Sequence, residues 1–363
     1  MRVHLALPVA MILLALSPLS AAAVEEGWRP PTQAGIVLPL QDFVGDTDVA
    51  NAVESYLALS LSNQFSMAAP GPLRDELRRL RIRAAARAAP ETLNRLADKL
   101  QVGWFVAAAI HEVVHQPIPR ITVSLRAFRA GSNRLGWAGI ESATLADGIS
   151  WLGMRPAGDM TFLIRTVTGR LAEGLAAPAE PSPPHLRLGR AKSEFLRQPH
   201  TPMPSGQVAV VPFSSMAEDR STLPVATATV ATQATLLEYG YHVVHPGVVD
   251  QALRAQGKYN LGEVNRELRL SLSQDENVAW VMTGAVEVYE QRPTSRDGPW
   301  VALSARLVEA ADGSILWMGS QDQQGVNTKS AFEQGIILSS GRLTQEITRS
   351  LIADIAYSRR SVP

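Results

Sequence analysis

The stretch Val102-Gly-Trp-Phe-Val-Ala-Ala-Ala-Ile110 decides the fold, because its pattern returns 176 residues later as Val278-Ala-Trp-Val-Met-Thr-Gly-Ala-Val286. Each stretch is an apolar run of strand length with a tryptophan at its third position, which is typical of a buried strand. A pattern that returns at long spacing predicts a repeated structural unit. The sequence on either side of both stretches supports this interpretation.

Upstream of each stretch the chain holds another strand pattern followed by a helix pattern. Gly35–Phe43 and Gln207–Phe213 are apolar runs in which a proline near the end stops strand pairing. Residues 48–64 then carry apolar side chains at helical spacing, with Asp46 and Asp48 as predicted N-caps. Residues 223–238 form the corresponding helix, with less contrast between its faces.

Downstream, Ile121–Phe128 matches Val301–Val308, with Ser124 and Arg126 in register with Ser304 and Arg306. Strand alternation places successive side chains on opposite faces. One predicted face therefore holds Ile121, Val123, Leu125 and Ala127, and the other holds Thr122, Ser124, Arg126 and Phe128.

Each copy closes with a turn, a third strand and a helix. Trp137 and Trp317 lie on the third strands, and Gly-Arg-Leu begins at Gly169 and Gly341 inside the last helices. The matches never break order. We therefore predict an α+β protein of two tandem βαβαβββα domains, each a mixed sheet with helices packed on one face.

The 363 residues suffice for two ordinary domains. The predicted organisation is a signal peptide over 1–23, a first domain over 24–177, a linker over 178–206, a second domain over 207–358, and a tail over 359–363. The linker contains seven prolines that favour extended segments, namely Pro178, Pro181, Pro183, Pro184, Pro199, Pro202 and Pro204.

The N-terminus has the features of an export signal. Met1-Arg2 precedes a largely apolar run over 5–16, and a small-residue cleavage site ends at Ala23. The chain has no cysteine, so it can form no disulfide and carry no lipoprotein anchor. We expect the cleaved protein to work in a bacterial periplasm, where a partner can hold it at the outer membrane.

Three segments of the second copy carry a family resemblance: Val208–Phe213, Ala279–Val286 and Asp312–Gly319. Their order resembles the N-terminal domain of TolB and its relatives, which include the curli-secretion lipoprotein and flagellar outer-membrane proteins. The resemblance implies a domain without an active site that binds envelope proteins and often oligomerises. The chain departs from the lipoprotein members because it lacks the lipid-carrying cysteine.

One motif points instead to an enzyme. His111-Glu112-Val-Val-His115 fits the zincin pattern, in which a helix presents two zinc-binding histidines on one face and the glutamate activates water. The alternative function is therefore a zinc metallohydrolase with Glu112 as catalytic residue and His111 and His115 as metal ligands.

The repeat favours a different interpretation of this motif. It aligns residues 111–115 with Glu287–Gln291, at the end of a strand. A strand would separate His111 from His115 by about 13 Å, too far for one zinc ion. We therefore predict neither a metal site nor a catalytic residue here.

Taken together, the sequence predicts a non-enzymatic periplasmic scaffold or adaptor that binds envelope proteins during assembly or export of a surface structure. The candidate interaction surface comprises Trp137, Trp317, Arg126 and Arg306, together with the edge and uncovered face of each sheet. No cofactor is expected. The formal net charge is zero, so nucleic acid is not an expected partner. A homo-oligomer, and a small-ligand module using a cleft between the domains, stay open as alternatives.

Overall fold

The computed structural model describes residues 28–82, 84–145, 159–177, 194–197, 206–217, 221–257, 264–291, 298–328 and 336–357. The predicted signal peptide and C-terminal tail lie outside these residues, as does most of the predicted linker. Two mixed sheets with accompanying helices are present. The predicted α+β class with two sheet-containing units is therefore confirmed.

The first unit builds a sheet of order β1-β3-β4-β5, with β2 also paired to β3. Its elements are β1 (Gly35–Val37), β2 (Gln41–Asp42), α1 (Thr47–Ser62), α2 (Pro70–Arg79), α3 (Pro90–Leu100), β3 (Trp104–Val114), β4 (Arg120–Arg129), β5 (Trp137–Thr144) and α4 (Met160–Ala176), with a short 3-10 turn at Ala85–Arg87. We call this sheet 1. Strands β1 and β3 are parallel, and the other pairs along the path are antiparallel.

The second unit builds sheet 2, of order β6-β12-β11-β10-β7-β9, with β8 also paired to β10. Its elements are β6 (Glu194–Arg197), β7 (Gln207–Val210), β8 (Ser214–Ser215), α5 (Leu223–Glu238), β9 (His242–Val243), α6 (Pro246–Ala255), α7 (Arg266–Glu276), β10 (Val278–Glu290), β11 (Trp300–Glu309), β12 (Ile315–Gln324) and α8 (Ser340–Tyr357), with a short 3-10 turn at Gly325–Thr328.

Strand β6 falls inside the segment that the sequence predicts to be a linker. Its four residues pair antiparallel with the middle of β12, from Trp317 to Ser320. An edge strand offers unpaired N–H and C=O groups, and an extended segment of the same chain can satisfy them. Part of the predicted linker is therefore a strand of sheet 2.

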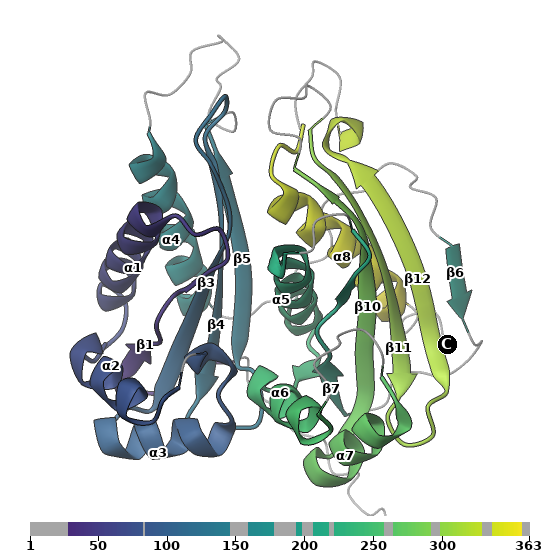
Figure 1. The fold of residues 1–363 in the computed structure, drawn as a ribbon, viewed down its shortest axis with the longest axis horizontal. Coiled ribbons are helices and arrows are strands. Elements are labelled where there is room, and N and C mark those ends of the chain that lie inside the picture. The colour runs from purple at the N-terminus through teal and green to yellow at the C-terminus, as the bar shows by residue number, and fades with distance from the viewer. Residues whose placement is uncertain are drawn as a thin grey trace, which may run out of the picture.

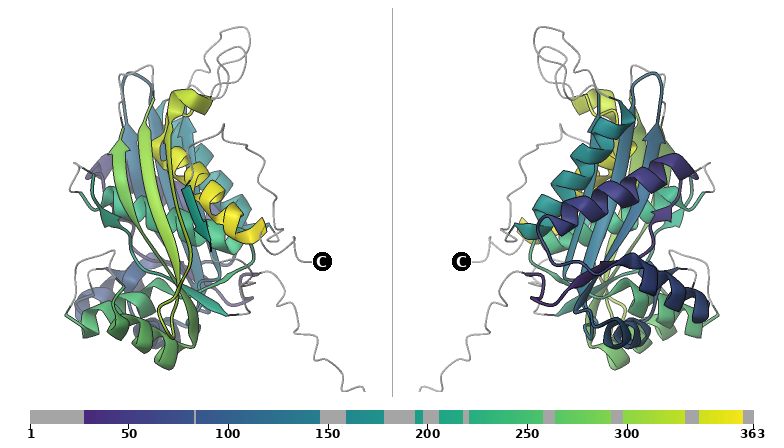
Figure 2. Two further views of the ribbon diagram at one scale, coloured as in Figure 1. Left: turned by 90° about the vertical axis from the view of Figure 1, so that its right-hand side faces the viewer. Right: turned by 90° about the vertical axis from the view of Figure 1, so that its left-hand side faces the viewer.

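The layers alternate between helices and sheets (Figure 1). Helices α1 and α4 pack on each other and on sheet 1, while α5 and α8 pack on each other and on sheet 2. The latter two helices also contact β5 and β3 of sheet 1. Sheet 1 is thus covered on both faces, and the side views in Figure 2 show the helix pair α1/α4 on its far side.

Helix α5 shows why the sequence pattern around it is unusual. Nearly all its residues are buried, including polar Thr227, Thr232 and Thr235. A helix without a solvated face is one enclosed on more than one side. The weak contrast between its faces therefore reflects its position between two sheets.

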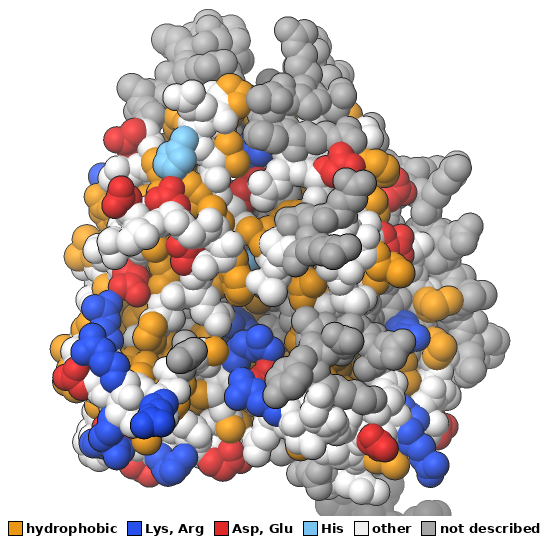
Figure 3. Space-filling model, viewed as in Figure 1, with side chains coloured by type: hydrophobic (Ala, Val, Ile, Leu, Met, Phe, Trp, Pro, Cys, Tyr) orange, Lys and Arg blue, Asp and Glu red, His pale blue; other side chains and the backbone are white. Residues whose placement is uncertain are grey.

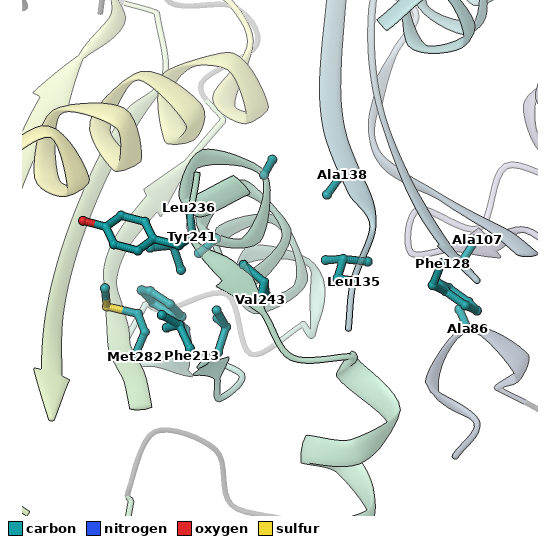
Figure 4. Packing of buried hydrophobic residues seen from close by; sticks show 14 of the residues in the cluster. Ala86, Ala107, Phe128, Leu135, Ala138, Phe213, Leu236, Tyr241, Val243 and Met282 are labelled. Carbon is teal, nitrogen blue, oxygen red and sulfur yellow. The ribbon is translucent and has the colours of Figure 1, made fainter. Parts of the chain in front are cut away.

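The two units share one apolar cluster, part of which is drawn in Figure 4. Phe128, Leu135 and Ala138 of the first unit belong to it, as do Leu236 and Val243 of the second. The backbones also join directly. The Leu135 N–H donates to the Val243 carbonyl at 2.8 Å, and the His245 N–H donates to the Asn133 carbonyl at 2.7 Å.

The ends of several helices follow from local sequence. The Asp46 carboxylate caps α1 by accepting from the Val49 N–H at 3.1 Å, as predicted. Helices α3 and α7 end at Gln101 and Asn277, both in the left-handed conformation and 176 positions apart. Among the described helices, none is both long and apolar enough to cross a bilayer.

Candidate functional site: the buried face between the two units

Strand pairing places the two units in one common register. Trp104 lies opposite Arg129, and Trp280 lies opposite Glu309. On the next pair of strands, Ser124 lies opposite Ile140 and Ser304 lies opposite Ser320. Position n on β3 therefore corresponds to n+176 on β10, and positions on β4 and β5 correspond to n+180 on β11 and β12.

Both long strands contain a bulge at the same place. Pairing of β3 with β4 shifts between Ile110 and Glu112, and pairing of β10 with β11 shifts between Val286 and Val288. The residue inside the first bulge is His111. Because a bulge sets two residues against one on the partner strand, His111 and Glu112 can both contact the second unit.

The His111 ring is fully buried and both its nitrogens have partners. Nδ1 lies 3.0 Å from Thr227 Oγ1 and Nε2 lies 2.7 Å from Ser124 Oγ. The Thr227 hydroxyl already donates to the Leu223 carbonyl at 2.8 Å, so it accepts from Nδ1–H. Ser124 then donates to Nε2, and the imidazole is neutral. Burial, with the nearby Arg126 charge, lowers the pKa of His111 to about 3.

Glu112 is the centre of a buried polar network across the two units. Its Oε1 accepts from Arg120 Nε at 2.7 Å, and its Oε2 accepts from Ser339 Oγ at 2.7 Å and Thr122 Oγ1 at 3.2 Å. Arg120 also donates to the Gln291 carbonyl at 3.2 Å. Ser339 precedes α8 and accepts from the Arg342 N–H. The carboxylate therefore fastens the start of α8 to sheet 1.

His115 follows the end of β3 and lies away from His111. Its exposed ring makes a 2.8 Å contact with Asp46, the cap of α1. The hydrogen bond from His115 lowers the pKa of the Asp46 carboxyl. The predicted strand placement of His111 and Glu112 is confirmed. In the described part of the chain, no group of three or more His, Asp or Glu side chains has the geometry to hold a metal ion.

Arg126 lies on the same buried face, 7% exposed. Burial, followed by repulsion from Arg87, lowers its pKa to about 10. In the described residues no carboxylate forms an ion pair with it. Arg87 itself pairs with Asp250 of α6, and this contact is a second charged link between the units.

His245 is the N-cap of α6 and packs at this boundary. Its Nδ1 accepts from the Gly247 N–H at 2.9 Å, and its ring lies perpendicular to Phe128, with centroids 4.4 Å apart. The ring is fully buried, and burial with the Arg126 charge lowers its pKa to about 3.

A third polar group occupies the boundary near β5, α5 and α8. Arg349 donates to both carboxylate oxygens of Glu238, at 3.0 and 2.8 Å. Burial raises the pKa of Glu141 and of Glu346, against the opposing charge of Arg349 and its neighbours. The Arg349–Glu238 pair thus joins α8 to α5 within the second unit. The small-ligand alternative stays a prediction.

The two tryptophans of the predicted interaction surface face helices. The Trp137 ring lies over Gly139 and against Gly174 of α4, where added Cβ atoms would fall 2.4 and 3.2 Å from it. Trp317 is 3% exposed, and its Nε1 donates to Asp354 of α8 at 3.0 Å. The strand face of Trp317 is the one that α8 covers.

The four predicted surface residues do not form one surface. Arg126 is buried between the units, and Trp137 and Trp317 face the helices of their own units. Arg306, half-buried, lies on the face of sheet 2 that points away from α5 and α8. Of the four, Trp137 and Arg306 are half-buried, and both stay predicted contacts for a partner.

An arginine-rich stretch from Arg74 to Arg81 lies away from this boundary, in the region where Figure 3 shows lysine and arginine side chains at the lower left. Helix α2 buries Leu73 and Leu77 and leaves Arg78 exposed. Glu76 accepts hydrogen bonds from both Arg79 and Lys99. These contacts are typical of the solvated face of an amphipathic helix.

Sequence reasoning missed Thr227, Ser142 and Ser339 as members of the buried network. One available signal was the polar face of β4, which carries Thr122, Ser124 and Arg126 in alternation. The other was the weak facial contrast of α5. Together these two patterns indicate a polar sheet face that a second layer covers.

Comparison with known proteins gives similarity only at the level of structure. No family model matches the sequence. No curated protein matches it. The PelC dodecamer from Paraburkholderia phytofirmans is 15% identical with a TM-score of 0.30, over 45% of this chain and 96% of that chain. Lipoprotein GNA1162 from Neisseria meningitidis is 23% identical with a TM-score of 0.31, over 42% and 99%.

The C-terminal domain of LpoB from Escherichia coli is 14% identical with a TM-score of 0.25, over 33% of this chain and 82% of that chain. Scores at this level carry no argument about what this chain does. The predicted presence of two tandem copies is not tested by these matches, because each covers less than half of the chain.

Proposed function

We propose that this chain is a non-enzymatic protein of the bacterial envelope, exported through its N-terminal signal and acting as a scaffold or adaptor for other envelope proteins. One observation carries the proposal. The side chains with the strongest catalytic chemistry, His111 and Glu112, are buried and fully engaged in bonds between the two units.

This arrangement suits a scaffold. Buried charged groups that are well paired fix one geometry, and removing one partner is costly. The Glu112–Arg120 and Arg87–Asp250 pairs both bridge the units or lie at their boundary. Two units fixed in one orientation present their outer surfaces at constant spacing, which is the property an adaptor needs.

Export is tested by expressing the full chain in a Gram-negative host and measuring the intact mass of the protein in the periplasmic fraction. We expect a mature chain that begins at Val24. A chain that retains Met1 and stays in the cytoplasm would contradict the proposal.

The adaptor role is tested by site-specific photo-crosslinking of the exported protein in living cells. Exposed positions such as Glu91 on α3 and Asp312 in the β11–β12 turn are suitable for the photoreactive residue. We expect reproducible adducts with an envelope protein. Adducts only with further copies of this chain, or none, would exclude the adaptor role.

A further inference from the structure

The face of sheet 1 that packs on the second unit has a register-matched counterpart on sheet 2. The interface face of sheet 1 comprises Ala107, Ala109, Glu112, Thr122, Ser124, Arg126, Ala138, Ile140 and Ser142. The corresponding positions, here called the outer face of sheet 2, are Thr283, Ala285, Val288, Ala302, Ser304, Arg306, Met318, Ser320 and Asp322. Alanine, serine and arginine recur at matched places, as Ala109/Ala285, Ser124/Ser304 and Arg126/Arg306.

These two faces differ in what covers them. Helices α5 and α8 cover the interface face of sheet 1, whose residues are buried. Among the described elements, α6 and α7 pack on sheet 2 from the other side, against β7 and the end of β10 near Val278 and Val281. Over the rest of the outer face, Thr283 and Ala302 are buried, Ser304 and Arg306 are half-buried, and Met318 is exposed.

Apolar side chains on sheet 2 are exposed where their counterparts are packed. Met216 is the counterpart of Phe43. The Phe43 N–H donates to the Ile110 carbonyl, and the Met216 N–H donates to the carbonyl of Val286, which corresponds to Ile110. Phe43 packs beside His111 in the shared core, whereas Met216 is 75% exposed. Likewise Ala138 is buried, and its counterpart Met318 is 38% exposed.

The helices show the complementary difference. Helices α1 and α4 hold the same place in the first unit as α5 and α8 hold in the second. Leu59 of α1 is 58% exposed, but Thr235, 176 positions later on α5, is fully buried. Phe162 of α4 is also exposed. We call the solvent side of α1 and α4, with Leu59, Phe162 and Gly169, the helix face.

The start of α8 identifies the point of contact. Gly341 lies against β4 so closely that a Cβ there would fall 2.4 Å from Thr122 Cγ2. The buried faces of α4 and α8 match at an offset of 180, as in Leu163/Leu343 and Leu171/Leu351. Gly341 therefore corresponds to exposed Thr161 at the start of α4, and not to Gly169 as the Gly-Arg-Leu match in the sequence indicates.

We propose that the outer face of sheet 2 binds the helix face of a second copy of this chain, in the way that sheet 1 binds α5 and α8. Thr161 of one copy would then approach Ala302 of the next, as Gly341 approaches Thr122. The contact is head-to-tail, so each added copy presents a new outer face, and the assembly grows into a ring or a filament. The inference does not depend on the proposed envelope role.

Two variants test the contact from its two sides. Ser304→Arg places a long charged side chain in the outer face, and Gly169→Gln places a side chain on the helix face where there is open space. We expect the mature wild-type protein to form concentration-dependent oligomers in sedimentation velocity runs. Each variant should weaken association at least about tenfold (1.4 kcal/mol) while keeping the wild-type circular dichroism spectrum. Glu91→Arg, on exposed α3, is the matched control and should assemble as wild type.

Mixing the two variants gives the decisive result. Each variant retains the face that the other has lost, so an equimolar mixture should form a 1:1 complex and nothing larger. A wild-type protein that stays monomeric across the concentration series would overturn the proposal, as would a mixture without the 1:1 complex. Loss of association in Ser304→Arg alone would indicate a symmetric contact through sheet 2, which also contradicts it.

Discussion

The interface face of sheet 1 and the outer face of sheet 2 share their register, and the strands that carry them share a bulge. The two faces are equally polar over their matched positions, yet only the first is buried throughout. At the position after the bulge, the covered face carries Glu112 and the less covered face carries Val288. The difference shows that a charged side chain can be buried here only with a network of hydrogen bonds. The Glu112 carboxylate is stable in the interior because Arg120, Thr122 and Ser339 donate hydrogen bonds to it.

The largest predicted effect is at this matched pair. Glu112→Ala leaves the buried Arg120 guanidinium without its carboxylate, and losing one partner of a buried pair costs about 3–5 kcal/mol. Val288→Ala removes a half-buried side chain and should cost about 1 kcal/mol. Urea unfolding followed by circular dichroism measures both values. Equal losses in the two variants would show that the two faces are energetically alike.

Acid should lower the unfolding free energy of the protein, because two histidines are buried at the boundary between the units. The pKa values of His111 and His245 are lowered to about 3 in the folded chain, against about 6.5 when unfolded. Below pH 6.5 the unfolded state binds more protons, so stability falls as pH drops towards 3, by up to about 1.4 kcal/mol per pH unit for each histidine. Unfolding free energies measured between pH 7 and 4 give this slope.

Variants separate the contributions to that slope. His111→Gln keeps a hydrogen-bonding side chain but removes the titrating group, and it should flatten the slope. His242→Gln removes an exposed histidine and serves as the control. If the slope is the same in wild type and His111→Gln, His111 is not held neutral by burial.

A smaller difference is expected between two helix positions that correspond in sequence. Thr227→Val on α5 removes the acceptor for His111 Nδ1–H and leaves a buried donor unsatisfied, at a cost of about 1–3 kcal/mol. Asn51→Ala, 176 positions earlier on the exposed side of α1, should change stability by less than about 0.5 kcal/mol. Thermal melts of both variants measure the pair. A larger loss in Asn51→Ala would reverse the assignment of covered and uncovered helices.

The smallest expected effect concerns zinc. The mature protein, dialysed and analysed by plasma mass spectrometry, should contain well below one zinc per chain, because His111 and His115 do not converge. His111→Ala should leave the metal content unchanged. Stoichiometric zinc that His111→Ala removes would restore the hydrolase alternative.

Much of the fold follows from local patterns in the sequence. The alternation along residues 121–128 placed Ile121 and Val123 on one face and Ser124 and Arg126 on the other, and the structure has both faces as predicted. The repeat offset of 176 aligned His111 with Glu287 and so predicted that His111 lies in a strand, as it does. These inferences succeed because strand period and register are properties of neighbouring residues.

The site was less accessible to sequence reasoning. A polar strand face such as that of Ser124 and Arg126 normally indicates contact with water, and only the packing of α5 shows otherwise. Bonds such as Ser339 to Glu112 join residues 227 positions apart. No local pattern encodes such a pair, so its members appear only when the two units are placed together.

The edges of sheet 2 have a consequence for how the protein behaves at high concentration. Strand β6 covers the middle of β12 at one edge, and Asn133–Leu135 bond to the backbone of β9 at the other. Two blocked edges protect a sheet from templating the strand-by-strand growth that leads to amyloid. At high protein concentration, association of this chain through sheet 2 should therefore use the faces of the sheet. Such face-to-face association is reversible and has a defined geometry.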